Sequence, residues 1–280
     1  MSCPVCDGTG WKMVERDGVR RATRCDCWRE QMTARLFTEA RIPRRYQHCD
    51  FGNFRDYNES LRRAKARAVK LADAFPVVDR GLFLDGPPGV GKTHLAVAVL
   101  RQAIATRGAK GLYYDTRDLL RVIRSTYDPV VRTTEFEVLK PVMKAELLVL
   151  DDLGAEKTSE WVEETLNLIV NTRYNERRPT IFTSNYEAQP DETDPNSLLC
   201  RIGFRMYSRL HEMCDFVALD AVDYRDEGAQ LSDEDLAAKW KMNPKGKARR
   251  IGAVRPSPAR AQLRDSKADL QWPGGRAGTS

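Results

Sequence analysis

The most specific chemical pattern in the chain is a glycine-rich run, Gly86-Pro87-Pro88-Gly89-Val90-Gly91-Lys92-Thr93. It fits G-x-x-x-x-G-K-[ST] at every fixed position. Glycines let the backbone curl so that several N–H groups point into one hollow and meet phosphate oxygens. In such a loop the lysine, here Lys92, reaches the β- and γ-phosphates, and the Thr93 hydroxyl ligates Mg²⁺. The run therefore predicts a site for nucleotide phosphates.

Two adjacent carboxylates follow an apolar stretch further along the chain. Asp151 and Asp152 end the run 147–152. In a parallel sheet the carboxyl ends of the strands face the crevice where ligands bind. We therefore expect Asp151 to hold Mg²⁺, directly or through water, and Asp152 to orient or deprotonate the attacking water. Asn185 ends another strand-like run, and its amide would position the same water if that strand lies beside the one before the loop.

Four of the seven cysteines lie within the first 27 residues, in the pairs Cys3-x-x-Cys6 and Cys25-x-Cys27. Four thiolates in two close pairs can complete a tetrahedral Zn²⁺ site. Residues 16–18 are typical of a hairpin tip between the pairs. The pattern therefore predicts a small zinc-ribbon-like module, and free thiols are the alternative reading.

The other cysteines and the chain start carry weaker signals. His48 and Cys49 are alternative ligands, although we expect them to be ordinary interior or surface residues. Cys200 and Cys214 are expected to be small core residues. The first residues lack the basic head and apolar stretch of a secretory signal, and no segment approaches about 18 consecutive apolar residues. These features predict a cytoplasmic protein with no membrane partner and no disulfide framework.

Strand-like and helix-like runs alternate between residues 81 and 220, which predicts a parallel α/β sheet covered by helices on both faces. Ser159 is a candidate N-cap for the long helix. The expected strands are 81–86, 111–115, 146–152, 179–185 and 216–220, and the expected helices are 93–101, 118–125, 159–177 and one or two within 195–213.

Charge divides the chain into regions. The net charge of +6 hides an acidic middle between two basic ends, which suggests contact with nucleic acid or an acidic partner, or simply a well-solvated surface. We expect a Cys-rich module over 1–30 and a basic helical linker or partner-binding region over 31–75. A nucleotide-binding domain over 76–226 and a mostly disordered basic tail over 227–280 follow.

Three motifs together resemble a known family: residues 86–94, the run Leu147-Leu148-Val149-Leu150-Asp151-Asp152-Leu153-Gly154, and Thr183-Ser184-Asn185. They are similar to the AAA+ ATPases of the DnaC/DnaI and IstB type, which are bacterial helicase loaders and transposition helper ATPases. The resemblance extends over residues 40–225 and includes the lead-in 42–46. It implies a P-loop AAA+ core with a five-stranded parallel sheet.

The resemblance also implies further roles. His94 follows the loop, as it commonly does in this family. Arg209 matches the arginine finger that reaches the nucleotide of a neighbouring subunit, with Arg205 as a rival, and Arg225 matches the second sensor of the same subunit. Helicase loaders of the DnaI kind carry a zinc-binding N-terminal module that contacts the helicase.

These signals lead to three hypotheses. The first is an ATP- and Mg²⁺-dependent ATPase that self-associates through its nucleotide site and loads or remodels a replicative helicase on single-stranded DNA. The second is a transposition helper that binds duplex DNA and recruits a transposase. The third is a zinc and nucleic-acid adaptor that holds ATP as a static ligand.

Overall fold

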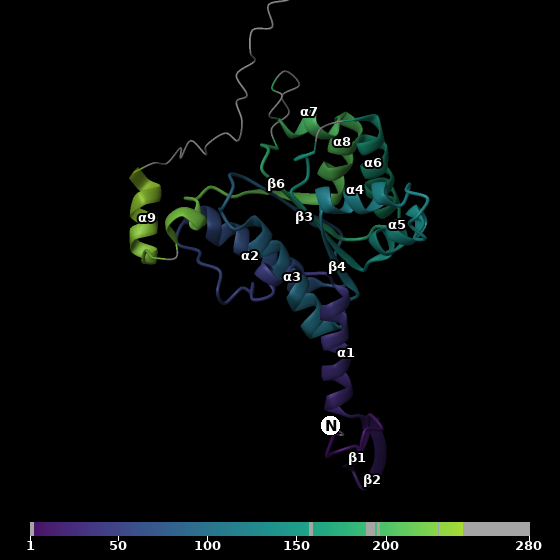
Figure 1. Ribbon diagram of the computed structural model, residues 1–280. Coiled ribbons are helices and arrows are strands. Elements are labelled where there is room, and N and C mark those ends of the chain that lie inside the picture. Colours follow the sequence, from purple (N-terminus) through teal and green to yellow (C-terminus); the bar gives the residue numbers. More distant parts are fainter. Residues whose placement is uncertain (1–2, 157–158, 189–193, 195–196, 229, 243–280) are drawn as a thin grey trace, which may run out of the picture. The chain divides into compact units, whose positions relative to one another are not determined.

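A five-stranded parallel sheet forms the centre of the computed structural model, which describes residues 3–156, 159–188, 194, 197–228 and 230–242 (Figure 1). All four strand pairs are parallel, and the strand order is β4-β5-β6-β3-β7. Every predicted strand is present, with the last beginning two residues earlier than expected. The strands are β3 (Gly81–Asp85), β4 (Gly111–Asp115), β5 (Leu147–Asp151), β6 (Thr180–Ser184) and β7 (Cys214–Ala218).

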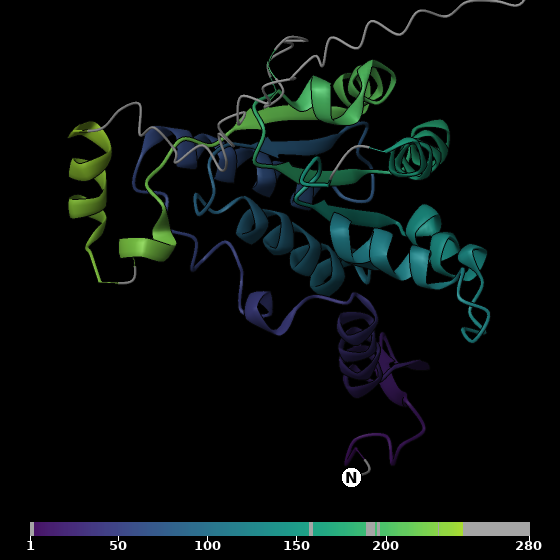
Figure 2. The same cartoon turned by 45° about the horizontal axis from the view of Figure 1, so that its top comes forward.

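Helices cover both faces of the sheet, as the fold class predicted (Figures 1 and 2). Leu82 and Leu84 point to one core, which α2 and α3 complete, whereas Phe83 points to a second core beneath α4–α6 and α8. Strands buried on both faces need continuous apolar runs rather than alternation. The helices are α2 (Glu59–Ala74), α3 (Lys92–Arg107), α4 (Thr116–Ser125), α5 (Glu135–Lys144), α6 (Glu160–Asn175), α7 (Leu198–Ile202) and α8 (Phe204–Met213).

The N-terminal residues form a hairpin followed by a helix. Strands β1 (Trp11–Arg16) and β2 (Val19–Arg24) are antiparallel, which confirms the predicted hairpin tip. Helix α1 (Asp26–Glu39) has Cys25 as its N-cap, so it begins inside the cysteine cluster. The boundary expected at residue 30 therefore falls within a helix. A short 3-10 turn (Arg44–Tyr46) then leads toward α2.

Three expectations differ from the structure. Helix α5 has no counterpart in the sequence analysis. The expected tail contains helix α9 (Asp233–Met242), whose fully buried Leu236 packs into the same core as α2, so packed structure continues past residue 227. Cys214 is buried as predicted, but Cys200 is exposed, because it lies on the outer side of the short α7. Residues 243–280 lie outside the described part.

A fully buried arginine joins α6 to its neighbours. The Nη1 of Arg173 donates to the carbonyl oxygens of Val142 (3.0 Å) and Ala145 (2.9 Å), and Nη2 donates to that of Pro179 (2.7 Å). Its Nε donates to Thr180 Oγ1 at 2.8 Å. The last carbonyls of a helix have no partner within that helix. Arg173 therefore caps the C-terminal end of α5 through a contact between distant parts of the chain.

Replacing Arg173 with methionine should lower the free energy of unfolding by about 3 kcal/mol, because several buried carbonyl groups lose their only cationic donor. Urea denaturation followed by circular dichroism measures this. Arg121→Ala is the control, since its ion pair with Asp118 on α4 is exposed, lies away from the end of α5 and should contribute under about 1 kcal/mol. A comparable, small loss for both variants would contradict the capping role.

When the described residues are searched, none of their helices combines the length and the apolar character that crossing a bilayer requires.

Candidate nucleotide site and cysteine cluster

The loop at residues 86–93 links the end of β3 to the start of α3 and has the backbone shape that its glycines allow. Gly89 and Gly91 have φ values of +78° and +99°, which side chains rarely tolerate. A Cβ on Gly91 would lie 2.7 Å from the Phe54 ring, and one on Gly89 would overlap the Asp223 carboxylate. Segments before and after the sheet core therefore pack against the loop and fix its shape.

Asp151 lies at the carboxyl end of β5 and is buried. Its Oδ1 accepts hydrogen bonds from the hydroxyls of Thr93 (2.9 Å) and Thr183 (2.6 Å). Its Oδ2 accepts one from Tyr113 at 2.6 Å. The structure thus brings Thr93 and Asp151 together at one edge of the sheet, as the sequence predicted. The contacts that Thr183 and Tyr113 make with Asp151 were not predicted, because only the order of the strands places these residues beside it.

Asn185 connects the loop lysine to the second carboxylate. Strand β6 pairs with β3, which meets the condition set for Asn185. Its Nδ2 donates to Asp152 Oδ1 at 2.5 Å, while its Oδ1 accepts from Lys92 Nζ at 2.8 Å. Lys92 also donates to the carbonyl oxygens of Gly86 (2.8 Å) and Pro87 (2.6 Å). The ammonium group therefore rests on the loop itself, in a position from which it can turn toward a phosphate.

Burial and neighbouring charges shift the pKa values of Lys92 and Asp152. Burial lowers the pKa of Lys92 to about 8, although Asp152 and Asp151 oppose the shift. Burial raises the pKa of Asp152, and Arg117 opposes that rise through an ion pair of 2.9 Å between Nη2 and Oδ2. Asp152 also has a left-handed φ of +58° and donates its backbone N–H to Thr183 Oγ1. Arg117 is a second contact that the sequence analysis missed.

Two residues that the family resemblance singled out, His94 and Arg225, lie near the loop but differ in their contacts. His94 Nε2 lies 2.9 Å from the Asp50 carbonyl oxygen, and its ring meets the Phe54 ring edge-on. His94 therefore contacts the segment just before α2. The backbone N–H of Tyr224 donates to Gly89 O at 3.2 Å. The next residue, Arg225, is close enough for its charge to contribute to the lowered pKa of Lys92.

Arg209 lies on α8, as does its rival Arg205. Its Nη1 donates to the Arg205 carbonyl oxygen at 3.1 Å. Within the described residues, no hydrogen bond or ion pair joins Arg209 to loop 86–93 or to the two aspartates. This placement leaves its guanidinium available to a neighbouring molecule rather than to its own site.

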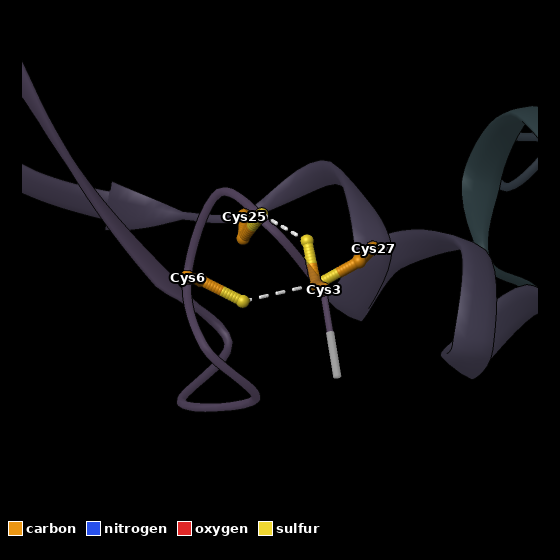
Figure 3. Close-up of side chains that lie close together, drawn as sticks. All are labelled: Cys3, Cys6, Cys25 and Cys27. Atoms are coloured by element: carbon orange, nitrogen blue, oxygen red, sulfur yellow. Dashed lines mark hydrogen bonds between the residues drawn. The ribbon is translucent and has the colours of Figure 1, made fainter. Parts of the chain in front are cut away.

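The four N-terminal cysteines gather in one cluster, with Cys3 and Cys6 in the loop before β1 and Cys25 and Cys27 at the start of α1 (Figure 3). All four sulfur atoms lie within 4.8 Å of one another. The distance between the sulfurs of Cys3 and Cys25 is 3.8 Å, and between those of Cys6 and Cys27 it is 3.3 Å. Tetrahedral zinc at bond lengths of about 2.3 Å separates its sulfur ligands by about 3.8 Å. The donor set therefore fits Zn²⁺.

Local hydrogen bonds support this arrangement. Burial raises the pKa of the Cys6 thiol, but hydrogen bonds from Cys27 and from the backbone N–H groups of Gly10 and Gly8 outweigh it and bring the pKa to about 7. The same hydrogen bond between Cys6 and Cys27 raises the pKa of Cys27. The pair therefore favours one thiolate, at Cys6, of the kind that metals bind. Cys49 is buried in the main core instead, and neither it nor His48 belongs to the cluster.

Comparisons with known proteins agree with this geometry. The family model of IstB-like ATP binding proteins matches residues 19–226. The replicative helicase loader DnaC of Escherichia coli K12 is 28% identical over 151 residues, which are 54% of this chain and 61% of that protein. The protein YqaM of Bacillus subtilis 168 is 25% identical over 221 residues, covering 75% of this chain and 66% of that protein. The chain thus spans about two thirds or less of these curated relatives.

Among solved structures, that of the DnaC helicase loader superimposes with a TM-score of 0.57 and 33% identity. The match covers 64% of this chain and 100% of that one.

Proposed function

We propose that this chain, which belongs to the family of IstB-like ATP-binding proteins, hydrolyses ATP with Mg²⁺ and loads or remodels a replicative helicase on single-stranded DNA. The observation that carries the proposal is the continuous set of contacts from Lys92 through Asn185 to Asp152 beside the Thr93–Asp151 pair. The AAA+ core of DnaC/IstB type supports ATP binding. The helicase and DNA partners are inferred from the likeness to DnaC.

Each residue of the site would have a separate role in binding and hydrolysing ATP. Lys92 would exchange the carbonyl oxygens of Gly86 and Pro87 for the terminal phosphate oxygens of ATP. Thr93 and Asp151 would hold Mg²⁺, which supplies charge neutralisation at the phosphates when bound. Asn185 contacts Lys92, and Asp152 contacts Asn185. These two residues would orient the attacking water, with Asp152 accepting its proton. Arg225 would contact the same nucleotide from the segment after β7.

Hydrolysis would also require a second copy of the chain. Among the described residues, Arg209 forms no hydrogen bond or ion pair with its own nucleotide loop. We propose that it reaches the γ-phosphate bound by a neighbour. A guanidinium supplied in this way stabilises transition-state charge. ATP would then lie at a subunit interface, so that self-association and turnover depend on each other.

The cysteine cluster would hold zinc in a module that contacts the helicase. The purified protein should contain one zinc ion per cluster, and Cys6→Ser should lose most of it, because a thiolate is removed from a four-ligand site. Metal analysis of dialysed protein measures this. Cys200→Ser, which lies outside the cluster, should keep the metal; equal zinc content in all three proteins, or none in the wild type, would contradict the site.

A transposition helper is the second candidate, because the matching family model carries the IstB name. A pull-down from host lysate with Asp152→Asn, which should retain ATP without hydrolysing it, separates the two. Recovery of a hexameric helicase supports the first function, and recovery of a transposase supports the second. A protein that binds ATP tightly but shows no turnover, with or without single-stranded DNA, would instead be an adaptor.

A further inference from the structure

Helix α2 presents two different faces. Leu61, Ala64, Ala68 and Leu71 are buried and pack into the core with α3. The opposite face is exposed and carries Arg62, Arg63, Arg67 and Lys70. At about 1.5 Å per residue, these cations extend over about 12 Å of helix. We define these four residues as the α2 basic stripe.

Few carboxylates on α2 are available to neutralise the positive charge of the α2 basic stripe. Helix α2 contains five cations but only two carboxylates, Glu59 and Asp73. Lys65 pairs with Asp56 at 3.5 Å, whereas Asp73 accepts a hydrogen bond from Gln102 at 2.7 Å. In the part of the chain that the structure describes, no member of the stripe forms an ion pair. Adjacent like charges on a helix repel one another, so an external anion would relieve this repulsion.

A hollow runs along the same helix. Its volume is about 810 Å³. Its lining combines three cations (Arg62, Lys65 and Lys70) and two carboxylates (Asp56 and Asp73) with the small side chains of Ala66, Val69 and Ala74. This face offers no aromatic or large aliphatic anchor of the kind that dominates protein–protein interfaces. Binding of a phosphate backbone needs no such anchor, because it is sequence-independent and electrostatic.

We propose that the α2 basic stripe binds the phosphate backbone of nucleic acid. The proposal deepens the proposed function, on which it rests, by naming a surface for DNA that is separate from the nucleotide site. The 12 Å stripe matches the length over which one strand of a duplex places about three to four phosphates, at about 3.4 Å each. Because the contacts are to phosphate alone, the surface should bind different sequences equally.

The test is fluorescence anisotropy of a labelled 20-nucleotide single strand with the full chain, from 50 to 200 mM KCl and without ATP. The variant combines Arg62→Ala, Arg67→Ala and Lys70→Ala. Its plot of log affinity against log salt should have a slope smaller by about 2, at about 0.7 for each lost phosphate contact. Alanine favours helix, so far-UV circular dichroism should match the wild type.

A matched control removes three exposed cations that form no ion pair among the described residues, in α5 and just before β4, through Lys110→Ala, Lys140→Ala and Lys144→Ala, and should keep the wild-type slope. An unchanged slope in the stripe variant, an equal loss in the control, or no binding by the wild type would overturn the proposal. Unchanged DNA binding would point to an acidic protein as the ligand of α2. ATP turnover by the wild type without DNA tests the proposed function separately, because the binding assay contains no nucleotide.

Discussion

Lys92→Ala should lower kcat/KM for ATP by roughly 10²- to 10³-fold, the usual cost of removing one preorganised donor from a site of developing charge. The buried ammonium lies within hydrogen-bond reach of the loop carbonyls and of Asn185. Lys92 is the only lysine of the loop at residues 86–93. Steady-state phosphate release and binding of a fluorescent ATP analogue measure the two parts of the effect.

Two controls keep this result interpretable. Lys110→Ala removes an exposed lysine away from the loop and should leave turnover unchanged. Because Lys92 also bonds the carbonyl oxygens of Gly86 and Pro87, thermal unfolding of Lys92→Ala must show that the loop change has not unfolded the domain. A folded Lys92→Ala protein with full turnover would refute the nucleotide site.

Arg209→Ala should leave ATP binding near the wild-type level but reduce kcat by about 10³-fold or more, the range seen when an arginine finger is removed. The same loss should not follow Arg205→Ala if Arg209 is the finger. Both arginines lie on α8, and neither forms an ion pair among the described residues, so the choice of Arg209 rests on the family resemblance and this pair of variants tests it. Single-turnover hydrolysis with saturating ATP measures the chemical step apart from binding.

Mixing experiments test whether this arginine acts between subunits. Arg209→Ala has an intact loop and Asp152, whereas Asp152→Asn has an intact arginine. If the site is shared, mixtures of the two inactive proteins should form some interfaces that combine both intact halves and recover part of the activity. Absence of recovery at every mixing ratio would count against an interface site.

The sequence predicted those parts of the site that local patterns determine. The loop follows a strand-like run and precedes a helix-like run, and the short apolar run before Asp151 is typical of a strand buried on both faces. The meeting of Thr93 with Asp151 followed because carboxyl ends of parallel strands share one edge. Asn185 required one further condition, namely that β6 lies beside β3, and the structure meets it.

Contacts that depend on strand order or tertiary packing were not predictable. Tyr113 reaches Asp151 because β4 lies next to β5, and Arg117 reaches Asp152 from the following helix. Helix α5 contains Pro141, which argues locally against a helix, yet a capping box at Thr134 starts it and the buried Arg173 satisfies its last carbonyls. Helix α9 is similar, since Leu236 gains its burial from the core around α2.

The most direct test of the nucleotide site is a crystal structure with a non-hydrolysable ATP analogue and Mn²⁺ in place of Mg²⁺. Anomalous scattering locates the metal independently of the protein fit. The expected result is a manganese ion bound between Thr93 and Asp151, with Lys92 moved from its loop carbonyls to the terminal phosphate and Asn185 facing the same phosphate. A nucleotide bound away from residues 86–93, or manganese bound without Asp151, would contradict the account.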